Sequence, residues 1–185
     1  MTDAFVNAIR LPLPVGEDPP LVRVREYAPA SADAIWDVYK TVTVRDALDP
    51  MTSELVRLRC ARVNGCRLCQ SLRLADAVRD GLDETLAGKV DDYEHSDLDE
   101  RHKAALRLTD AFIAAPDTID ATTRADLQRW FSDEEIQELL LDMVAWLQQK
   151  VLIAFALDIP VDPDALTSME YDGDGNSVLG GMTVS

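Results

Sequence analysis

Residues 132–147 carry the strongest structural signal in the sequence, a helix start followed by a single apolar stripe. Ser132 and Glu135 have the spacing of a capping box, in which each side chain binds the other residue's backbone N–H. The apolar residues that follow share one helix face: Ile136, Leu139, Leu140, Met143, Val144 and Leu147. The pattern predicts a long helix here, which we expect to continue to Leu157.

Helix signals of the same kind recur along the rest of the chain, and they predict an all-α fold. Asp49 followed by Pro50 is typical of a helix cap with proline at the first helical position. Only residues 21–24 resemble a strand, and no second run of alternating β-branched residues is available to pair with them. We expect a bundle of about six to eight helices, with further helices over residues 31–44, 49–63, 66–80, 97–115 and 120–130.

Proline and glycine divide the chain into three parts. Residues 1–30 have prolines at positions 12, 14, 19, 20 and 29, too many for a helix or a central strand, so an extended N-terminal arm is expected. Residues 31–160 make up the predicted helical domain. Residues 161–185 are acidic and then Gly-rich, and this C-terminal tail is expected to be only partly ordered.

The charge and hydropathy of the chain exclude two classes of partner. The sequence has 18 Lys and Arg against 34 Asp and Glu, and its formal net charge of −16 would repel nucleic-acid phosphates. The apolar stretch 139–161 is interrupted by Asp142, Gln148, Gln149 and Lys150, so no segment approaches the roughly 20 apolar residues that span a bilayer. The N-terminus lacks a secretory pattern, and a cytoplasmic location is expected.

Cys66 and Cys69 form a CxxC pair, which in a cytoplasmic chain indicates redox chemistry or metal binding. A zinc site would need two further ligands, and the candidates are Cys60, His95 and His102. We expect Cys60 to be a buried apolar residue and both histidines to lie on the surface. A thioredoxin-like fold would need a βαβ context, which the sequence lacks. Thiol redox chemistry without a metal or cofactor is therefore the favoured interpretation.

The surroundings of this pair predict a reversible dithiol with a stabilised thiolate. An Asn-Gly turn precedes Cys66, which places Cys66 in the first turn of the expected 66–80 helix and Cys69 on the same face. The start of a helix favours a thiolate, and Arg73 lies on the same stripe. Glu54 should lie alongside the early 70s on the preceding helix, so a Glu54–Arg73 ion pair is expected, with solvated surface charges as the alternative.

Residues 54–69 resemble the core of the alkylhydroperoxidase D-like proteins of the carboxymuconolactone decarboxylase superfamily; their sequence is ELVRLRCARVNGCRLC. The similarity continues through residues 77–84 and 132–136. The resemblance implies a helical domain that forms homo-oligomers, as trimers, hexamers or dimers. It also implies that Cys69 is the peroxidatic nucleophile and Cys66 the resolving thiol. A hydroperoxide would be the substrate, and a dithiol such as a lipoyl-bearing adaptor would be the reductant.

Arg73 departs from this motif, because the family places a histidine four residues after the second cysteine. Arginine keeps its proton at every accessible pH, so it can stabilise a thiolate but cannot relay protons. Leu68 likewise stands where the members with the best-known peroxidase chemistry carry a histidine. Proton transfer is then assigned to Glu54 or to water. The alternatives are a redox-silent helical oligomer and a lactone enzyme of the carboxymuconolactone decarboxylase type.

The net charge also bears on the choice of peroxide. A surface of charge −16 disfavours anionic fatty-acid peroxides. Such substrates would require Arg57, Arg59, Arg62 and Arg73 to gather at the entrance of the site, which helical spacing permits for some of them.

Overall fold

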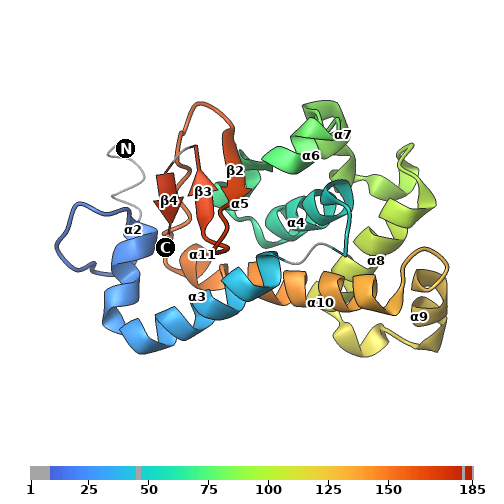
Figure 1. Ribbon diagram of the computed structural model, residues 1–185, viewed down its shortest axis with the longest axis horizontal. Coiled ribbons are helices and arrows are strands. Elements are labelled where there is room, and N and C mark those ends of the chain that lie inside the picture. Colours follow the sequence, from blue (N-terminus) through green and yellow to red (C-terminus); the bar gives the residue numbers. More distant parts are fainter. Residues whose placement is uncertain (1–8, 45–46, 181, 185) are drawn as a thin grey trace.

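Helices make up most of the structure, which confirms the predicted helical class (Figure 1). The computed structural model describes residues 9–44, 47–180 and 182–184. The longer helices are α3 (Pro29–Thr43), α4 (Pro50–Asn64), α8 (Glu100–Ala114) and α10 (Asp133–Leu147). The shorter ones are α2 (Pro20–Arg23), α5 (Arg67–Ser71), α6 (Ala75–Arg79), α7 (Glu84–Gly88), α9 (Ala121–Leu127) and α11 (Lys150–Ala154), with 3-10 turns η1 (Val24–Tyr27), η2 (Lys89–Asp91), η3 (Tyr93–His95) and η4 (Pro116–Thr118). No helix in the described part of the chain combines the length and apolar character needed to cross a membrane.

α4 is the central helix of the molecule, and it packs against α8, α10, α5 and α6 (Figure 1). Its side chains Leu55, Val56 and Leu58 are at most 1% exposed, and they belong to the same core as Leu106 of α8 and Leu139 of α10. Burying one side chain of this kind contributes roughly 1.5–3 kcal/mol. The core therefore fixes the position of α4, and with it the turn that leads into the CxxC pair.

The start signals of α4 and α10 are confirmed. The Asp49 carboxylate accepts a hydrogen bond from the backbone N–H of Thr52 at 2.8 Å, and both bonds of the Ser132–Glu135 capping box are present. Gly65 ends α4 with φ of 69°, in the left-handed region that favours glycine. The continuation of α10 to Leu157 is wrong, because α10 ends at Leu147 and α11 is a separate short helix.

A small sheet is the main feature that the sequence analysis does not predict. Its four strands are β1 (Leu72–Leu74), β2 (Thr167–Tyr171), β3 (Ser177–Leu179) and β4 (Met182–Val184), in this spatial order. β1 is parallel to β2, and the other pairs are antiparallel. The expected 66–80 helix is therefore wrong, since β1 separates α5 from α6. The C-terminal tail, which was expected to be only partly ordered, contributes the other three strands.

The N-terminal arm is helical in its second half. α2 begins at Pro20, whose ring sets a φ that suits the first turn of a helix, and η1 leads from it into α3. Residues 9–19 form no helix or strand, as expected, whereas residues 1–8 lie outside the described chain. The Arg10 N–H donates to the carbonyl of Phe155 at 3.0 Å, so this extended part is attached to α11.

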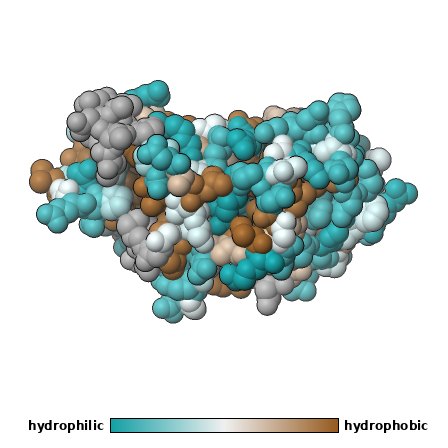
Figure 2. Space-filling model, turned by 90° about the horizontal axis from the view of Figure 1, so that it is seen from above, coloured by the Kyte–Doolittle hydropathy of each residue, from teal (hydrophilic) through white to brown (hydrophobic). Residues whose placement is uncertain are grey.

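The outer surface reflects the composition of the chain. Hydrophilic residues cover most of the face shown in Figure 2, and apolar residues appear there in separate patches. This agrees with a chain in which 28% of the residues are charged.

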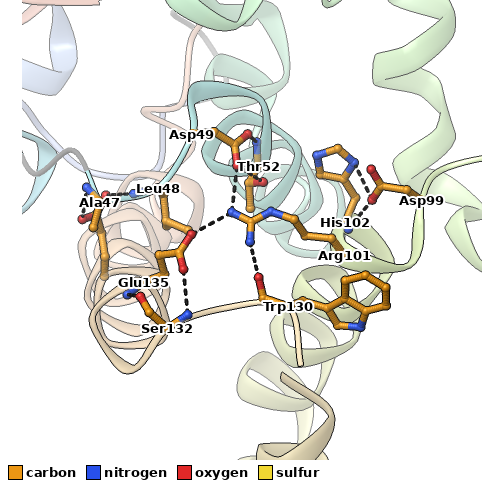
Figure 3. Close-up of polar contacts among 11 residues, drawn as sticks. Ala47, Leu48, Asp49, Thr52, Asp99, Arg101, His102, Trp130, Ser132 and Glu135 are labelled. Carbon is orange, nitrogen blue, oxygen red and sulfur yellow. Dashed lines mark hydrogen bonds and ion pairs between the residues drawn. The ribbon is translucent and has the colours of Figure 1, made fainter. Parts of the chain in front are cut away.

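Arg101 of α8 joins the starts of α4 and α10 (Figure 3). Its Nη2 donates to the Asp49 carboxylate at 3.0 Å and to the Glu135 carboxylate at 2.9 Å, and its Nη1 donates to the carbonyl of Trp130. Because Asp49 caps α4 and Glu135 belongs to the capping box of α10, one guanidinium group stabilises both helix starts.

We expect Arg101→Met to lower the free energy of unfolding by about 1–3 kcal/mol at pH 7, because two carboxylates lose a charged partner. Burial opposes ionisation of Asp49 and Glu135, but their hydrogen bonds outweigh it and lower the pKa of both. Their contribution is therefore complete above the ordinary carboxyl pKa of about 4, and it is lost as the pH falls through the lowered folded-state values.

Chemical denaturation of the wild type and of Arg101→Met at several pH values checks this expectation. The difference in unfolding free energy should shrink as the solution is made acidic, and a difference that does not change with pH would contradict it. Arg79→Met is the matched control, since Arg79 is 65% exposed and its ion pair should contribute within about 0.5 kcal/mol.

Candidate active site

Cys66 and Cys69 are joined by a disulfide at the start of α5, and their Cα atoms are 5.3 Å apart. Cys66 is the N-cap residue of α5 and does not lie within its first turn, and its Sγ accepts a hydrogen bond from the backbone N–H of Cys69 at 3.1 Å. Cys66 is 2% exposed and Cys69 is 8% exposed. The spacing therefore does bring both sulfurs together, with Cys69 the more accessible of the two.

A cavity of about 30 Å³ lies against the disulfide. A cavity needs roughly 10–15 Å³ to hold one water molecule, so this cavity accommodates about two atoms the size of oxygen. Besides the cysteines, its polar walls come from several elements: Tyr39 of α3, Arg57 and Asn64 of α4, Gln149 and Lys150. The disulfide is thus covered by the rest of the fold and not laid open on the surface.

Gln149 reaches the disulfide from the junction between α10 and α11. Its side-chain oxygen Oε1 contacts the Sγ of Cys69 and lies 3.8 Å from the Sγ of Cys66. In the sequence, Gln149 stands out only as an interruption of an apolar stretch. That interruption was the available signal, because a polar residue within an apolar helical segment often serves a buried site.

Glu54 pairs with Arg57, one turn further along α4, and the expected pair with Arg73 is wrong. Nε of Arg57 donates to Oε2 of Glu54 at 2.6 Å, and Nη2 donates to Oε1 at 2.8 Å. Glu54 is 0% exposed and Arg57 is 5% exposed. Burial alone would lower the pKa of Arg57, but Glu54 outweighs it and raises the pKa. Glu54 does not line the sulfur cavity, whereas Arg57 does.

Two arginines hold the C-terminal end of α5. Nη1 of Arg57 donates to the carbonyl of Cys69, and its Nη2 donates to the carbonyl of Leu72, both at 2.7 Å. Nη1 of Arg73 also donates to Leu72, at 2.6 Å, while Nε of Arg73 binds the Glu84 carboxylate at 2.7 Å. These bonds satisfy carbonyls where the helix gives way to β1. Because β1 interrupts the helix, Arg73 leaves the predicted stripe and does not line the sulfur cavity.

Asp158 fixes the other end of α5. Its carboxylate accepts from the backbone N–H of Arg67 at 2.8 Å and from Nη2 of the same residue at 2.7 Å. The Asp158 carbonyl accepts from the backbone N–H of Leu68 at 3.1 Å. The Asp158 side chain is 3% exposed, so its carboxylate is largely shielded from water, whereas the Arg67 side chain is 38% exposed. The dithiol therefore lies on a short helix that is held at both ends.

The two histidines take no part in this site. His95 is the last residue of η3 and pairs with Asp92, and His102 lies in the first turn of α8 and pairs with Asp99. Neither histidine lines the sulfur cavity. Asp99 caps α8, so this helix begins three residues later than the expected start at residue 97.

Cys60 is buried on α4, as predicted, and burial raises the pKa of its thiol to about 12. Because the thiolate is the reactive form, we expect Cys60 to resist iodoacetamide at pH 8 in the native reduced protein, while Cys69, the most exposed of the three cysteines, is modified. Mass spectrometry of the digested protein checks this expectation, and denatured protein is the control in which all three cysteines react. Native modification of Cys60 at the rate of Cys69 would be inconsistent with this burial.

The helical fold and the Cys66–Cys69 disulfide at the start of α5 together identify the chain as a helical dithiol protein. Residues 29–110 match the carboxymuconolactone decarboxylase family. The matched part of the chain contains both cysteines, Glu54 and Arg73.

Two curated relatives are uncharacterized proteins from two strains of Mycobacterium tuberculosis. Each is 39% identical to this chain over 135 residues, which is 72% of this chain and 48% of the relative. The chain therefore spans about half the length of the curated relatives it matches.

Solved structures show the same fold. The core of an alkylhydroperoxidase AhpD-type, peroxidase-related protein from Ralstonia eutropha has a TM-score of 0.69 and 16% identity, covering 84% of this chain and 93% of that one. A protein of unknown function from Agrobacterium tumefaciens has a TM-score of 0.62 and 21% identity, covering 76% and 98%. The debrominase Bmp8 has a TM-score of 0.63 and 19% identity, covering 78% of each chain. The fold is alkylhydroperoxidase D-like, as the resemblance implied.

Proposed function

We propose that this protein is a thiol-dependent peroxidase that reduces hydroperoxides with the Cys66–Cys69 dithiol. The observation that carries the proposal is the disulfide itself, which lies beside a small cavity with Arg57 and Gln149 in its wall. A purely structural bridge would not require a cavity and a buried cation next to the sulfurs. The family of residues 29–110 supports the same chemistry.

In the proposed cycle the Cys69 thiolate attacks the O–O bond of the hydroperoxide. One oxygen becomes part of a sulfenic acid on Cys69, and the other leaves as an alkoxide that takes a proton from water. The Cys66 thiol then attacks the sulfenic sulfur, so that water leaves and the disulfide forms. A dithiol reductant supplies two electrons and two protons, which restores both thiols and leaves the reductant as a disulfide.

The residues around the dithiol have different roles in this proposal. Cys69 is the nucleophile because it is the more accessible sulfur and because Arg57, bound to its carbonyl, brings positive charge. Glu54 acts through Arg57, since both of its carboxylate oxygens accept from that guanidinium group. Arg73 supports the end of α5. Water in the cavity is then the proton carrier.

The site favours small, uncharged peroxides. A cavity of about 30 Å³ fits hydrogen peroxide or the peroxy end of a larger molecule. Of the arginines considered for binding an anionic substrate, Arg57 lines the cavity, whereas Arg59 binds Asp110 and Arg73 binds Glu84. Fatty-acid peroxides are therefore poor candidates.

The proposal includes a dithiol reductant, such as a lipoyl-bearing adaptor, and a homo-oligomer in the cytoplasm. Exposed apolar side chains on α3, α10 and α11 support self-association. Ile35, Val38, Val144 and Val151 are 53%, 55%, 51% and 56% exposed, which is high for aliphatic residues on neighbouring helices.

Consumption of hydrogen peroxide with dihydrolipoamide as donor tests the proposed function. We expect turnover that depends on both substrates and that is slower with a bulky aromatic hydroperoxide. Absence of turnover with any dithiol donor would contradict the proposal and favour a redox-silent oligomer. Activity on a ring lactone that survives loss of both thiols would instead favour a carboxymuconolactone decarboxylase type of enzyme.

A further inference from the structure

Gln149 differs from the other polar side chains of the sulfur cavity, because the polar contacts of its amide are with the two sulfur atoms. The Arg57 guanidinium binds Glu54 and two carbonyls, and the Tyr39 hydroxyl bonds with Tyr171 at 3.1 Å. Asn64 donates to the carbonyl of Cys60 at 2.7 Å. Within the described residues, the Gln149 side chain has polar contacts only with Cys69 and Cys66.

We propose that Gln149 is a positioning residue for Cys69, whose amide holds the reacting sulfur and stabilises its thiolate. This inference rests on the proposed peroxidase function, in which Cys69 must ionise. It gives a role to a residue outside the 29–110 family match, on a segment that folds over the CxxC pair. It also supplies a sulfur-contacting side chain in a site where Arg73 stands in place of the motif histidine and does not line the cavity.

The chemistry of a primary amide suits both protonation states of the sulfur. After reduction, a Cys69 thiol can donate its S–H to Oε1 of Gln149, which already lies against that sulfur. A thiolate needs a donor instead, and rotation of the same amide by half a turn presents Nε2–H. Such a bond to an ionised acceptor is stronger than one between neutral groups. Unlike imidazole, the amide stays uncharged at every accessible pH, so it orders the sulfur without relaying a proton.

The other charged and titratable groups around Cys69 set the background for this effect. Arg57 faces it from α4 with a charge that Glu54 balances, and Lys150 lines the cavity at the start of α11. Tyr39 from α3 and Cys60 from α4 also line the cavity. Among the described residues, the side chain that contacts Sγ of Cys69 with a polar atom is that of Gln149.

The pKa of Cys69 in the reduced full-length protein tests the proposal. The probe is iodoacetamide, and the rate of Cys69 alkylation is followed as a function of pH. Trypsin cleaves after Arg67, so Cys66 and Cys69 fall in separate peptides and are quantified separately. The variants are Gln149→Met, which keeps the length but removes the donor, and Gln149→Glu, which adds a negative charge. Gln148→Met is the matched control, because Gln148 is adjacent and half-buried but does not line the cavity.

We expect Gln149→Met to raise the pKa of Cys69 by about 1 unit, which lowers the thiolate fraction about tenfold at a pH well below the wild-type pKa. Gln149→Glu should raise it further, and Gln148→Met should leave it unchanged. An unchanged or lowered pKa in both Gln149 variants, with circular dichroism like that of the wild type, would overturn the proposal. Alkylation does not require a peroxide, so a wild type that fails to consume peroxide would refute the proposed function without affecting this result.

Discussion

Cys69→Ser should lose peroxide turnover by at least about 10³-fold, because the oxygen of serine is a far weaker nucleophile than a thiolate and no other sulfur occupies its position. Steady-state consumption of hydrogen peroxide with a dithiol donor measures the loss. Cys60→Ser is the control, and it should retain turnover because Cys60 is buried with a pKa raised to about 12.

Cys66→Ser should separate the two sulfur roles. Without a resolving thiol, Cys69 is oxidised once and remains a sulfenic acid, which a dimedone adduct on the 68–73 tryptic peptide detects. Turnover with the dithiol donor should fall, although the first oxidation should proceed at a rate close to that of the wild type. Full turnover in both Cys66→Ser and Cys69→Ser would contradict the dithiol mechanism.

Glu54→Gln should lower the free energy of unfolding by about 3–5 kcal/mol, because it leaves the buried Arg57 charge without its counter-ion. The substitution should also disturb the position of the dithiol, since Arg57 donates hydrogen bonds to the carbonyls of Cys69 and Leu72. Denaturant unfolding measures the loss, and the rate of disulfide formation after reduction reports on the geometry of the dithiol.

A matched substitution tests whether the loss in unfolding free energy comes from leaving a buried charge unpaired or only from removing an ion pair. Glu84→Gln removes the carboxylate partner of Arg73, but the Glu84 side chain is 58% exposed, so the expected loss is below about 1 kcal/mol. The double variant Glu54→Leu with Arg57→Met should be more stable than Glu54→Gln, because no unpaired charge remains. Equal losses in Glu54→Gln and Glu84→Gln would contradict this account of the buried pair.

The parts of the fold that local chemistry determines were predictable from the sequence. Asp49, Gly65 and the Ser132–Glu135 pair mark helix ends through bonds within a few residues of each other, and the structure contains those bonds. The CxxC spacing likewise predicts two nearby sulfurs, because both cysteines lie within one turn of chain. Helical periodicity was sufficient for α3, α4, α8 and α10.

The features that were missed depend on contacts between distant segments. β1 is only Leu72–Leu74, and it becomes a strand because β2, almost a hundred positions later in the chain, pairs with it. This break moves Arg73 off the predicted stripe and toward Glu84. Gln149 reaches the dithiol from a separate helix junction, so no spacing rule around the cysteines indicates it. The Glu54–Arg57 ion pair was also missed, although it joins residues one helix turn apart and its spacing is visible in the sequence.

The intact mass of the reduced protein after one equivalent of hydrogen peroxide, measured under non-reducing conditions, tests the central claim most directly. A working dithiol should lose about two mass units as the two thiol hydrogens leave, and it should remain free of disulfide-linked dimers. Digestion should then place the new bond between Cys66 and Cys69. An unchanged mass, a stable gain of oxygen, or a bond between separate chains would contradict a reversible Cys66–Cys69 couple.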